Sequence, residues 1–238
     1  MSRLTILMYH RAASIPPDTR YPKNFVSPVT FRAQIEALLG WGYEPITFGQ
    51  WMSYREHAGR IPRRPFIVTF DDGYDDFAKN AWPVLKPLGV PATVFLVASK
   101  LGRTNDWDAD EPQTQLLDAT AIRELESEGV EFGGHGFSHI ALARVSPNEA
   151  REEVVRCHGA LVGLLRKPPE VFAYPYSNQS ATVRKLVREA GFKCAVRGKG
   201  RLNWRWTDPF GLRRILMHEG VGAHEFERTL SRLRWMVD

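Results

Sequence analysis

The chain has 238 residues, of which 43% are hydrophobic, 25% charged and 11% aromatic, and its formal net charge is +5. A chain of this length and composition folds as one large domain, here residues 1–238, without needing disulfides or a structural metal. It contains no run of 18 apolar residues, and the apolar run near the N-terminus is too short for a signal peptide, so we expect a cytoplasmic protein. Its basic residues are scattered rather than gathered in one tract, which favours a solvated surface over a nucleic-acid partner.

Short apolar runs alternate with longer segments of helical periodicity along the whole chain. The predicted strands are Leu4–Tyr9, Phe66–Phe70, Val94–Val97, Val130–Phe132, Val171–Tyr174, Lys193–Val196 and Leu212–Met217. The predicted helices are Thr30–Leu39, Ala119–Glu128, Pro147–Leu165, Ala181–Ala190 and Ala223–Met236. This alternation predicts an α/β fold with a parallel sheet, whose reacting groups gather at the carboxyl ends of the strands.

The longest irregular segment, Leu101–Gln115, holds Trp107 between polar residues. Long loops in α/β proteins are often functional, and an exposed tryptophan suits stacking on a sugar face. A surface insertion explains the segment equally well. We therefore keep Trp107 as a candidate substrate-binding residue.

Two adjacent carboxylates, Asp71 and Asp72, directly follow the predicted strand Phe66–Phe70, and Gly73 permits a sharp turn behind them. Neighbouring side chains at a strand end point in different directions, so one carboxylate can bind a metal while the other faces a reacting water. Two like charges this close repel unless a cation lies between them or one is protonated. Taken alone, Asp-Asp-Gly is more often a turn than a site.

A pair of histidines, His135 and His139, follows the strand Val130–Phe132. Histidines four residues apart in one turn can bind a common metal, and no glutamate of the HExxH type accompanies them. With Asp72 they would form a set of three protein ligands that leaves coordination positions open, which is typical of a catalytic metal site.

These motifs, followed by Phe172-Ala173-Tyr174-Pro175-Tyr176, resemble the polysaccharide deacetylase family, also called the NodB-homology or carbohydrate esterase family 4 domain. The resemblance extends from about Leu4 to about Met217, with the motifs in the family's order. It implies a distorted (β/α)7 barrel in a single domain.

The resemblance also implies roles for individual residues. Asp71 would be the general base, and Asp72, His135 and His139 would hold a divalent metal, commonly zinc, with cobalt, nickel or manganese as alternatives. By analogy, the backbone N–H of Tyr176 would stabilise the oxyanion. Tyr176 and its neighbour Pro175 would wall the substrate groove.

Two positions depart from the family pattern. Gly136 replaces the serine or threonine that usually follows the first histidine, so a loop-stabilising hydrogen bond is missing. Ala173 replaces the arginine that usually orients the catalytic aspartate. We name Arg214 as the candidate for that cation because its strand should end near the site, with a surface arginine as the equal alternative.

The general acid has two candidates, each at the end of a predicted strand. His218 matches the family's Leu-x-His sequence in its usual chain order. His10, in Tyr9-His10, resembles family members in which this motif has moved to the N-terminus. We favour His10 because the chain begins with that strand.

The C-terminal segment places Phe226, Leu230, Leu233 and Val237 on one helical face. Such a helix usually packs on its own barrel, and a peripheral contact with an anionic membrane is the minor alternative. The oligomeric state is not indicated by the sequence.

We expect a metal-dependent N-deacetylase that removes acetyl from an N-acetylated sugar, an oligosaccharide or a lipid-linked glycan. Hydrolysis of another acyl group, such as formyl on a lipid-linked sugar, is the alternative within enzymes. A catalytically silent glycan-binding module is the alternative outside them, and the presence of all three ligands and the base argues against it.

Overall fold

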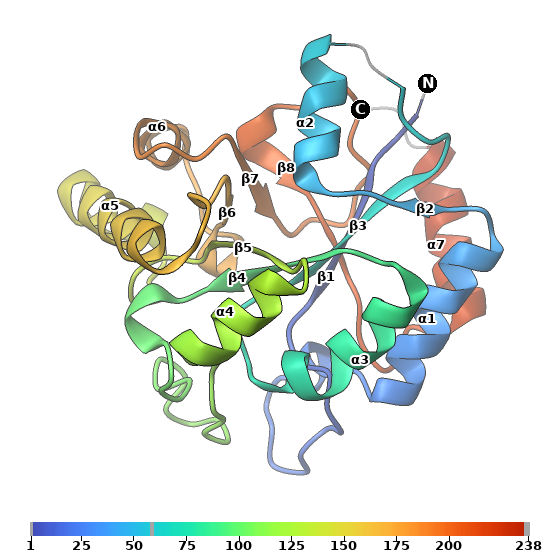
Figure 1. Ribbon diagram of the computed structural model, residues 1–238, viewed down its shortest axis with the longest axis horizontal. Coiled ribbons are helices and arrows are strands. Elements are labelled where there is room, and N and C mark those ends of the chain that lie inside the picture. The colour runs from blue at the N-terminus through green and yellow to red at the C-terminus, as the bar shows by residue number, and fades with distance from the viewer. Residues whose placement is uncertain (1, 58–59, 236–238) are drawn as a thin grey trace.

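Parallel strands surrounded by helices make up the computed structural model, which describes residues 2–57 and 60–235 (Figure 1). The strands are β1 (Thr5–Tyr9), β2 (Glu44–Pro45), β3 (Pro65–Phe70), β4 (Ala92–Leu96), β5 (Glu131–Gly134), β6 (Val171–Ala173), β7 (Cys194–Arg197), β8 (Leu212–Arg213) and β9 (Ile215–Leu216). Their order in the sheet is β8-β7-β6-β5-β4-β3-β1-β9, and β2 pairs with β3 off this path. Every one of these strand pairs is parallel.

The two ends of this order, β8 and β9, are consecutive in the chain and are separated only by Arg214. β8 pairs with β7, and β9 pairs with β1. The predicted strand Leu212–Met217 is therefore interrupted, and it passes from one neighbour to the other. This produces a nearly closed parallel barrel with one seam, which confirms the predicted distorted (β/α)7 fold in a single domain.

The helices are α1 (Pro28–Gly40), α2 (Phe48–His57), α3 (Trp82–Leu85), α4 (Ala119–Ser127), α5 (Pro147–Leu164), α6 (Ala181–Glu189) and α7 (Ala223–Trp235). Ser146 caps α5 by accepting a hydrogen bond from Glu149 N, and Pro147 occupies the first position, so this helix begins where the sequence predicts. Helices α2 and α3 were not predicted. The π-helical turn Phe77–Ala81 and the proline inside α3 obscure the helical pattern there.

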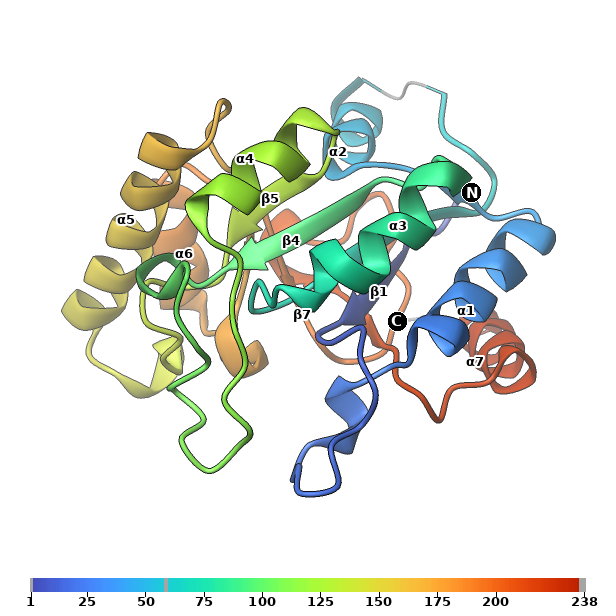
Figure 2. The same ribbon diagram turned by 60° about the horizontal axis from the view of Figure 1, so that its bottom comes forward.

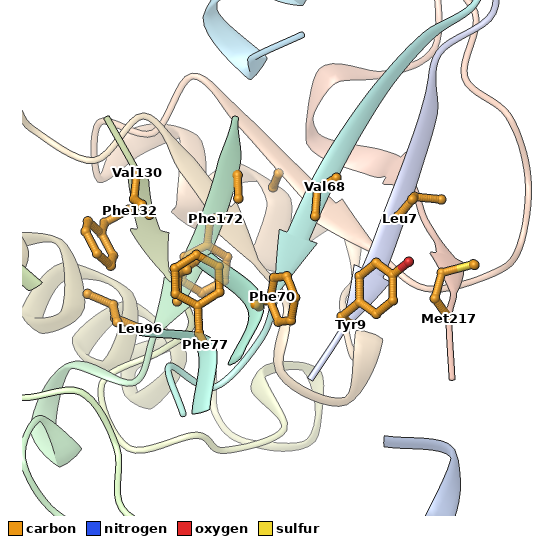
Figure 3. Packing of buried hydrophobic residues seen from close by; sticks show 14 of the residues in the cluster. Leu7, Tyr9, Val68, Phe70, Phe77, Leu96, Val130, Phe132, Phe172 and Met217 are labelled. Carbon is orange, nitrogen blue, oxygen red and sulfur yellow. The ribbon is translucent and has the colours of Figure 1, made fainter. Parts of the chain in front are cut away.

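Two apolar layers hold the barrel together. Inward-facing side chains such as Ile6, Ile67 and Phe95 fill its interior. The alternate residues of the same strands, among them Tyr9 and Phe70, pack outward beneath the helices, and their rings stack with centroids 5.2 Å apart (Figure 3). Because parallel strands are buried on both faces, all six residues of β3 are buried.

Helix α7 packs against its own barrel over its described part. Phe226 is fully buried beside Trp41 at the end of α1, with ring centroids 6.0 Å apart, and Leu230 is buried too. The side chain of Leu233, and residues Met236 and Val237, lie outside the described residues. Among the described helices, none is long and apolar enough to cross a membrane.

Candidate metal centre

A pocket of about 230 Å³ opens at the carboxyl ends of the strands, and the residues that the motifs single out line it. Asp71 and Asp72 reach it from the end of β3, His135 and His139 from the loop after β5, and His10 from the end of β1. Residues far apart in sequence converge because parallel strands bring their carboxyl ends to one rim.

Asp72, His135 and His139 form a buried cluster whose ligand atoms all lie within 4.8 Å of one another. Asp72 Oδ1 is 3.3 Å from His135 Nε2 and 3.2 Å from His139 Nε2. His135 Nδ1 donates a hydrogen bond to the backbone oxygen of Ala173 (2.8 Å), and His139 Nδ1 lies 3.1 Å from Tyr176 Oη. A proton on Nδ1 of His135 directs the Nε2 lone pair at the cluster, which is the arrangement that metal-binding histidines use.

This donor set fits a divalent metal. A buried carboxylate that faces an unprotonated Nε2 is repelled by its lone pair unless a cation or an added proton lies between them. One carboxylate oxygen and two imidazole nitrogens are ligands that zinc accepts in catalytic sites. The cluster is therefore a candidate divalent-metal site, as the sequence predicts.

The backbone at two of these ligands has unusual geometry. Asp72 (φ 72°) and His139 (φ 65°) both adopt the left-handed conformation, which costs free energy in residues other than glycine. Gly73 follows with φ 77°, and a Cβ on it would lie 2.8 Å from Leu96 Cδ2. The turn after β3 thus requires glycine at this position in order to direct Asp72 inward.

Asp71 forms a buried ion pair with Arg214. The guanidinium donates from Nη1 to Asp71 Oδ1 (2.5 Å) and from Nη2 to Asp71 Oδ2 (2.6 Å), and Nη1 also donates to Thr69 Oγ1 (3.0 Å). Burial alone would raise the pKa of Asp71, but the charge and hydrogen bonds of Arg214, together with the charges of His135 and His10, outweigh it and hold that pKa below its usual value. Asp71 is therefore an ionised carboxylate, and the cation beside it comes from the seam of the barrel rather than from position 173.

Of the two histidine candidates for the acid, only His10 lines this pocket. His10 Nε2 lies 4.0 Å from Asp71 Oδ2, and its side chain is 17% exposed. Burial lowers the pKa of His10 and outweighs the opposing attraction of the two aspartates. His218 lies elsewhere: its Nδ1 accepts a hydrogen bond from Gly220 N (3.1 Å) in the turn after β9.

Of the three candidate substrate-binding residues, Tyr176 lines the pocket, whereas Trp107 and Pro175 lie next to residues that line it. Tyr176 is 57% exposed, and its ring contacts that of His139, with centroids 4.6 Å apart. The Trp107 ring lies on the same imidazole, also at 4.6 Å. Pro175 is buried, 3.4 Å from where a Cβ on Gly136 would lie.

Glu153, a buried carboxylate of α5, belongs to none of the sequence motifs. It accepts hydrogen bonds from Phe137 N (3.0 Å), Ser138 N (2.9 Å) and Ser138 Oγ (2.5 Å), in the loop between the two histidines. This clamp stabilises the loop in which Gly136 replaces the family's serine or threonine. Gly136 itself has φ 81°, so a side chain there would be strained.

The motifs also do not include Arg11 and Asp76, a pair of residues that anchors the chain just after His10. The two side chains form a buried ion pair, and Asp76 Oδ1 also accepts a hydrogen bond from Ala12 N (2.9 Å). The Arg11 guanidinium lies over the ring of Tyr74, 4.1 Å from its centroid. No local pattern signals either residue, because the pair joins segments that are far apart in the sequence.

The barrel and its rim cluster define a deacetylase-like α/β fold with a candidate metal site. Residues 58–195 match the family model described as Polysaccharide deacetylase, and because this is more than half of the chain, the protein belongs to that family. The predicted resemblance is thereby confirmed.

Known proteins extend the likeness over nearly the whole chain. The poly-beta-1,6-N-acetyl-D-glucosamine N-deacetylase of Staphylococcus aureus (strain MSSA476) is 22% identical over 216 residues, which are 87% of this chain and 72% of that protein. The Streptococcus pyogenes deacetylase PplD, solved in complex with acetate, superposes with a TM-score of 0.82 at 22% identity and covers 95% of this chain and 97% of its own. A de-N-acetylase from Aggregatibacter actinomycetemcomitans gives a TM-score of 0.82 at 16% identity, with 96% and 100% covered. At these identities the two structures support the fold.

Proposed function

We propose that the protein is a metal-dependent N-deacetylase that removes acetyl from an N-acetylated amino sugar of a glycan or glycoconjugate. The observation that carries this proposal is the convergence of an Asp-His-His cluster and an arginine-paired aspartate in one pocket. The sugar amide as substrate is supported by the family and by the named activity of the Staphylococcus aureus relative.

Asp72, His135 and His139 would hold the cation, with zinc as the first choice and cobalt, nickel or manganese as alternatives. When bound, a divalent metal polarises an amide carbonyl and acidifies water at neutral pH. Three protein ligands leave coordination positions open for this chemistry.

The remaining residues would move protons and orient the substrate. Asp71, kept ionised by Arg214, takes the proton of the attacking water. His10, on the same side of the pocket, gives a proton to the departing amine. The backbone N–H of Tyr176 donates to the developing oxyanion, and the rings of Tyr176 and Trp107 contact the sugar.

Acetate release from a panel of N-acetylated sugars, polymeric and lipid-linked, tests this proposal with zinc and with chelator present. We expect release that chelator abolishes and that Asp71→Asn reduces by about 10³-fold, since a general base contributes on the order of 10²–10⁴. The variant should still bind one metal ion per chain.

Asp75→Asn is the matched control, because Asp75 follows in the same turn but pairs with Lys79 at the surface. It should keep the wild-type rate. Release that persists with chelator, or an Asp71→Asn variant as fast as the control, would contradict the proposed mechanism. Metal binding without acetate release from any sugar would point instead to another acyl group.

A further inference from the structure

Three aspartates alternate along the loop between β4 and α4, and one of them faces the metal pocket. Asp106 pairs with Lys100 (2.8 Å), and Asp110 pairs with Arg20 (2.9 Å) at the surface. Asp108 is half-buried and lines the pocket. The structure shows no ion pair between Asp108 and any lysine, arginine or histidine that it describes. A partly buried carboxylate without a counter-charge is unfavourable, so its place beside the metal ligands calls for a functional reason.

The backbone around Asp108 is held in a fixed turn. Asp108 N donates to Asn105 O (3.1 Å), and Asp108 O accepts from Glu111 N (2.9 Å) and from Gln113 Nε2 (3.1 Å). Asn105 is itself buried, and its Oδ1 accepts from Thr114 N (2.7 Å). The Asp108 carboxylate is therefore presented to the pocket by an ordered segment.

Two tyrosines line the pocket together with Asp108. Tyr21 belongs to the loop after β1, and it shares with Asp108 both the main pocket and a small cavity of about 20 Å³ beside it. The loops that carry these two residues project from the same end of the molecule (Figure 2), where Thr19 Oγ1 donates to Glu111 Oε2 (2.6 Å). Tyr176 follows β6, and burial, with the charge of Asp108 next in importance, raises its pKa to about 12. We call Tyr21, Asp108 and Tyr176 the Asp108 cluster.

The tyrosines of the Asp108 cluster are far more exposed than the metal ligands. Asp72 and His139 are each 6% exposed, whereas Tyr21 is 50% and Tyr176 57% exposed. A reacting amide has to reach the buried ligands. The Asp108 cluster, which lies further out, would therefore meet the part of the glycan next to the reacting sugar.

A carboxylate beside aromatic rings suits an organic cation. The carboxylate accepts charge-assisted hydrogen bonds from an ammonium group, and the face of an aromatic ring attracts a cation within about 6 Å of its centroid. Removal of an acetyl group from an amino sugar produces such a cation, because the free amine is protonated at and below neutral pH. A partly deacetylated glycan thus carries ammonium groups next to acetylated residues.

We propose that the Asp108 cluster is a subsite for the ammonium group of an already deacetylated sugar, so that the protein prefers an acetylated residue whose neighbour is a free amino sugar. This inference rests on the proposed function and adds a substrate preference to it. Asp108 contacts the neighbouring sugar and none of the reacting atoms.

The test compares substrates that differ by one amine. Zinc-loaded protein is given the fully acetylated N-acetylglucosamine tetramer and tetramers in which one residue, at each position in turn, carries a free amine. For at least one position we expect kcat/KM for acetate release to be about tenfold higher than for the fully acetylated tetramer, because hydrogen bonds to charged groups contribute on this order. The gain should appear in KM rather than in kcat, since the ammonium binds away from the reacting amide.

Two neighbouring substitutions separate this role from a general change in charge. Asp108→Asn keeps the shape of the side chain and removes its charge, so the preference for a free amine should disappear. Asp106→Asn removes the same charge two residues away, where the carboxylate pairs with Lys100, and it should keep the preference of the wild type. Asp108→Asn that lowers kcat/KM equally for every tetramer would overturn the proposal in favour of a contact with sugar hydroxyls. A loss of zinc affinity that accounts for the slower reaction would also overturn it, because Asp108 would then balance the charge of the metal site.

Binding of the fully deacetylated glucosamine tetramer gives a readout without turnover. In isothermal titration, the wild type and Asp106→Asn should bind this tetramer about tenfold more tightly than Asp108→Asn does. Equal affinities in the two variants would overturn the subsite. Wild-type protein that releases acetate equally from all the tetramers would overturn it too, while leaving the proposed function intact. Binding that depends on Asp108 without acetate release from any sugar would support the ammonium site and contradict the proposed function.

Discussion

Arg214 supplies the positive charge that the family pattern has at position 173. Its guanidinium reaches Asp71 across 143 residues of sequence, from the interruption between β8 and β9. Because Arg214 provides the cation, position 173 can be occupied by the small residue Ala173, which is fully buried. Its carbonyl oxygen accepts a hydrogen bond from His135. From the sequence, Arg214 was a candidate for this cation, but a role as an ordinary surface arginine was an equal alternative. Only the closure of the barrel decides which strand end faces Asp71.

The general acid can be tested by comparing the two histidine candidates. His10→Gln should lower kcat about 10²–10³-fold, because His10 lies in the pocket beside Asp71 and general acid catalysis contributes on this order. His218→Gln should stay close to the wild-type rate, since His218 is bonded to Gly220 outside the pocket. Steady-state kinetics at saturating zinc, with metal content checked for both variants, measures this. A loss of rate in His218→Gln alone would reverse the assignment.

At the scale of elements, the conformation of the loop after β5 depends on hydrogen bonds to Glu153 of helix α5. Glu153→Gln should weaken zinc binding about 10–100-fold, the range seen when a group that orients metal ligands is lost. The substitution removes the charged acceptor from three hydrogen bonds that fix the segment between His135 and His139. Isothermal titration with zinc measures the affinity, and the visible spectrum of the cobalt-loaded protein reports the ligand geometry.

Glu152→Gln is the control for this experiment, because Glu152 is the preceding residue of the same helix and pairs with Arg156 at the surface. It should bind zinc as the wild type does. Equal affinities in the two variants would show that the loop holds its shape without α5.

The contrast between His135 and Glu153 shows which site residues a sequence can predict. Motif residues directly follow apolar strand runs, so their place at the rim follows from the alternation of strands and helices. Glu153 lies inside an ordinary amphipathic helix, where a glutamate usually faces solvent. The glycine at position 136 signalled a missing hydrogen bond in the loop, but nothing in the sequence indicated which side chain replaces it.

At the scale of the whole molecule, the fold class was predictable from the strand–helix alternation and the barrel from the family resemblance, but the position of the seam was not. The alternating pattern indicates a parallel sheet, which the structure confirms. The run Leu212–Met217 looks like one uninterrupted strand, because pairing to different neighbours before and after Arg214 leaves no trace in local apolarity. The contact between the loops after β1 and β4 was equally hidden, since Glu111 accepts a hydrogen bond from Thr19, which lies 92 residues away in the sequence.

Metal binding should stabilise the entire barrel, because the ligands belong to separate parts of the chain that come together only on folding. Asp72 follows β3, whereas His135 and His139 follow β5, two strands away in the sheet. A ligand that binds only the folded state at 100 times its Kd contributes about 2.7 kcal/mol. For a domain of this size, that should raise Tm by about 5–10 °C.

Thermal unfolding of chelator-treated protein, with and without added zinc, measures this shift. Asp72→Asn should abolish it, whereas Asp75→Asn, whose carboxylate pairs with Lys79 at the surface, should retain it. The same shift in Asp72→Asn would mean that zinc stabilises the protein from another site. If the zinc-induced rise in Tm is lost in Asp72→Asn but kept in Asp71→Asn, Asp72 is required for metal binding and Asp71 is not.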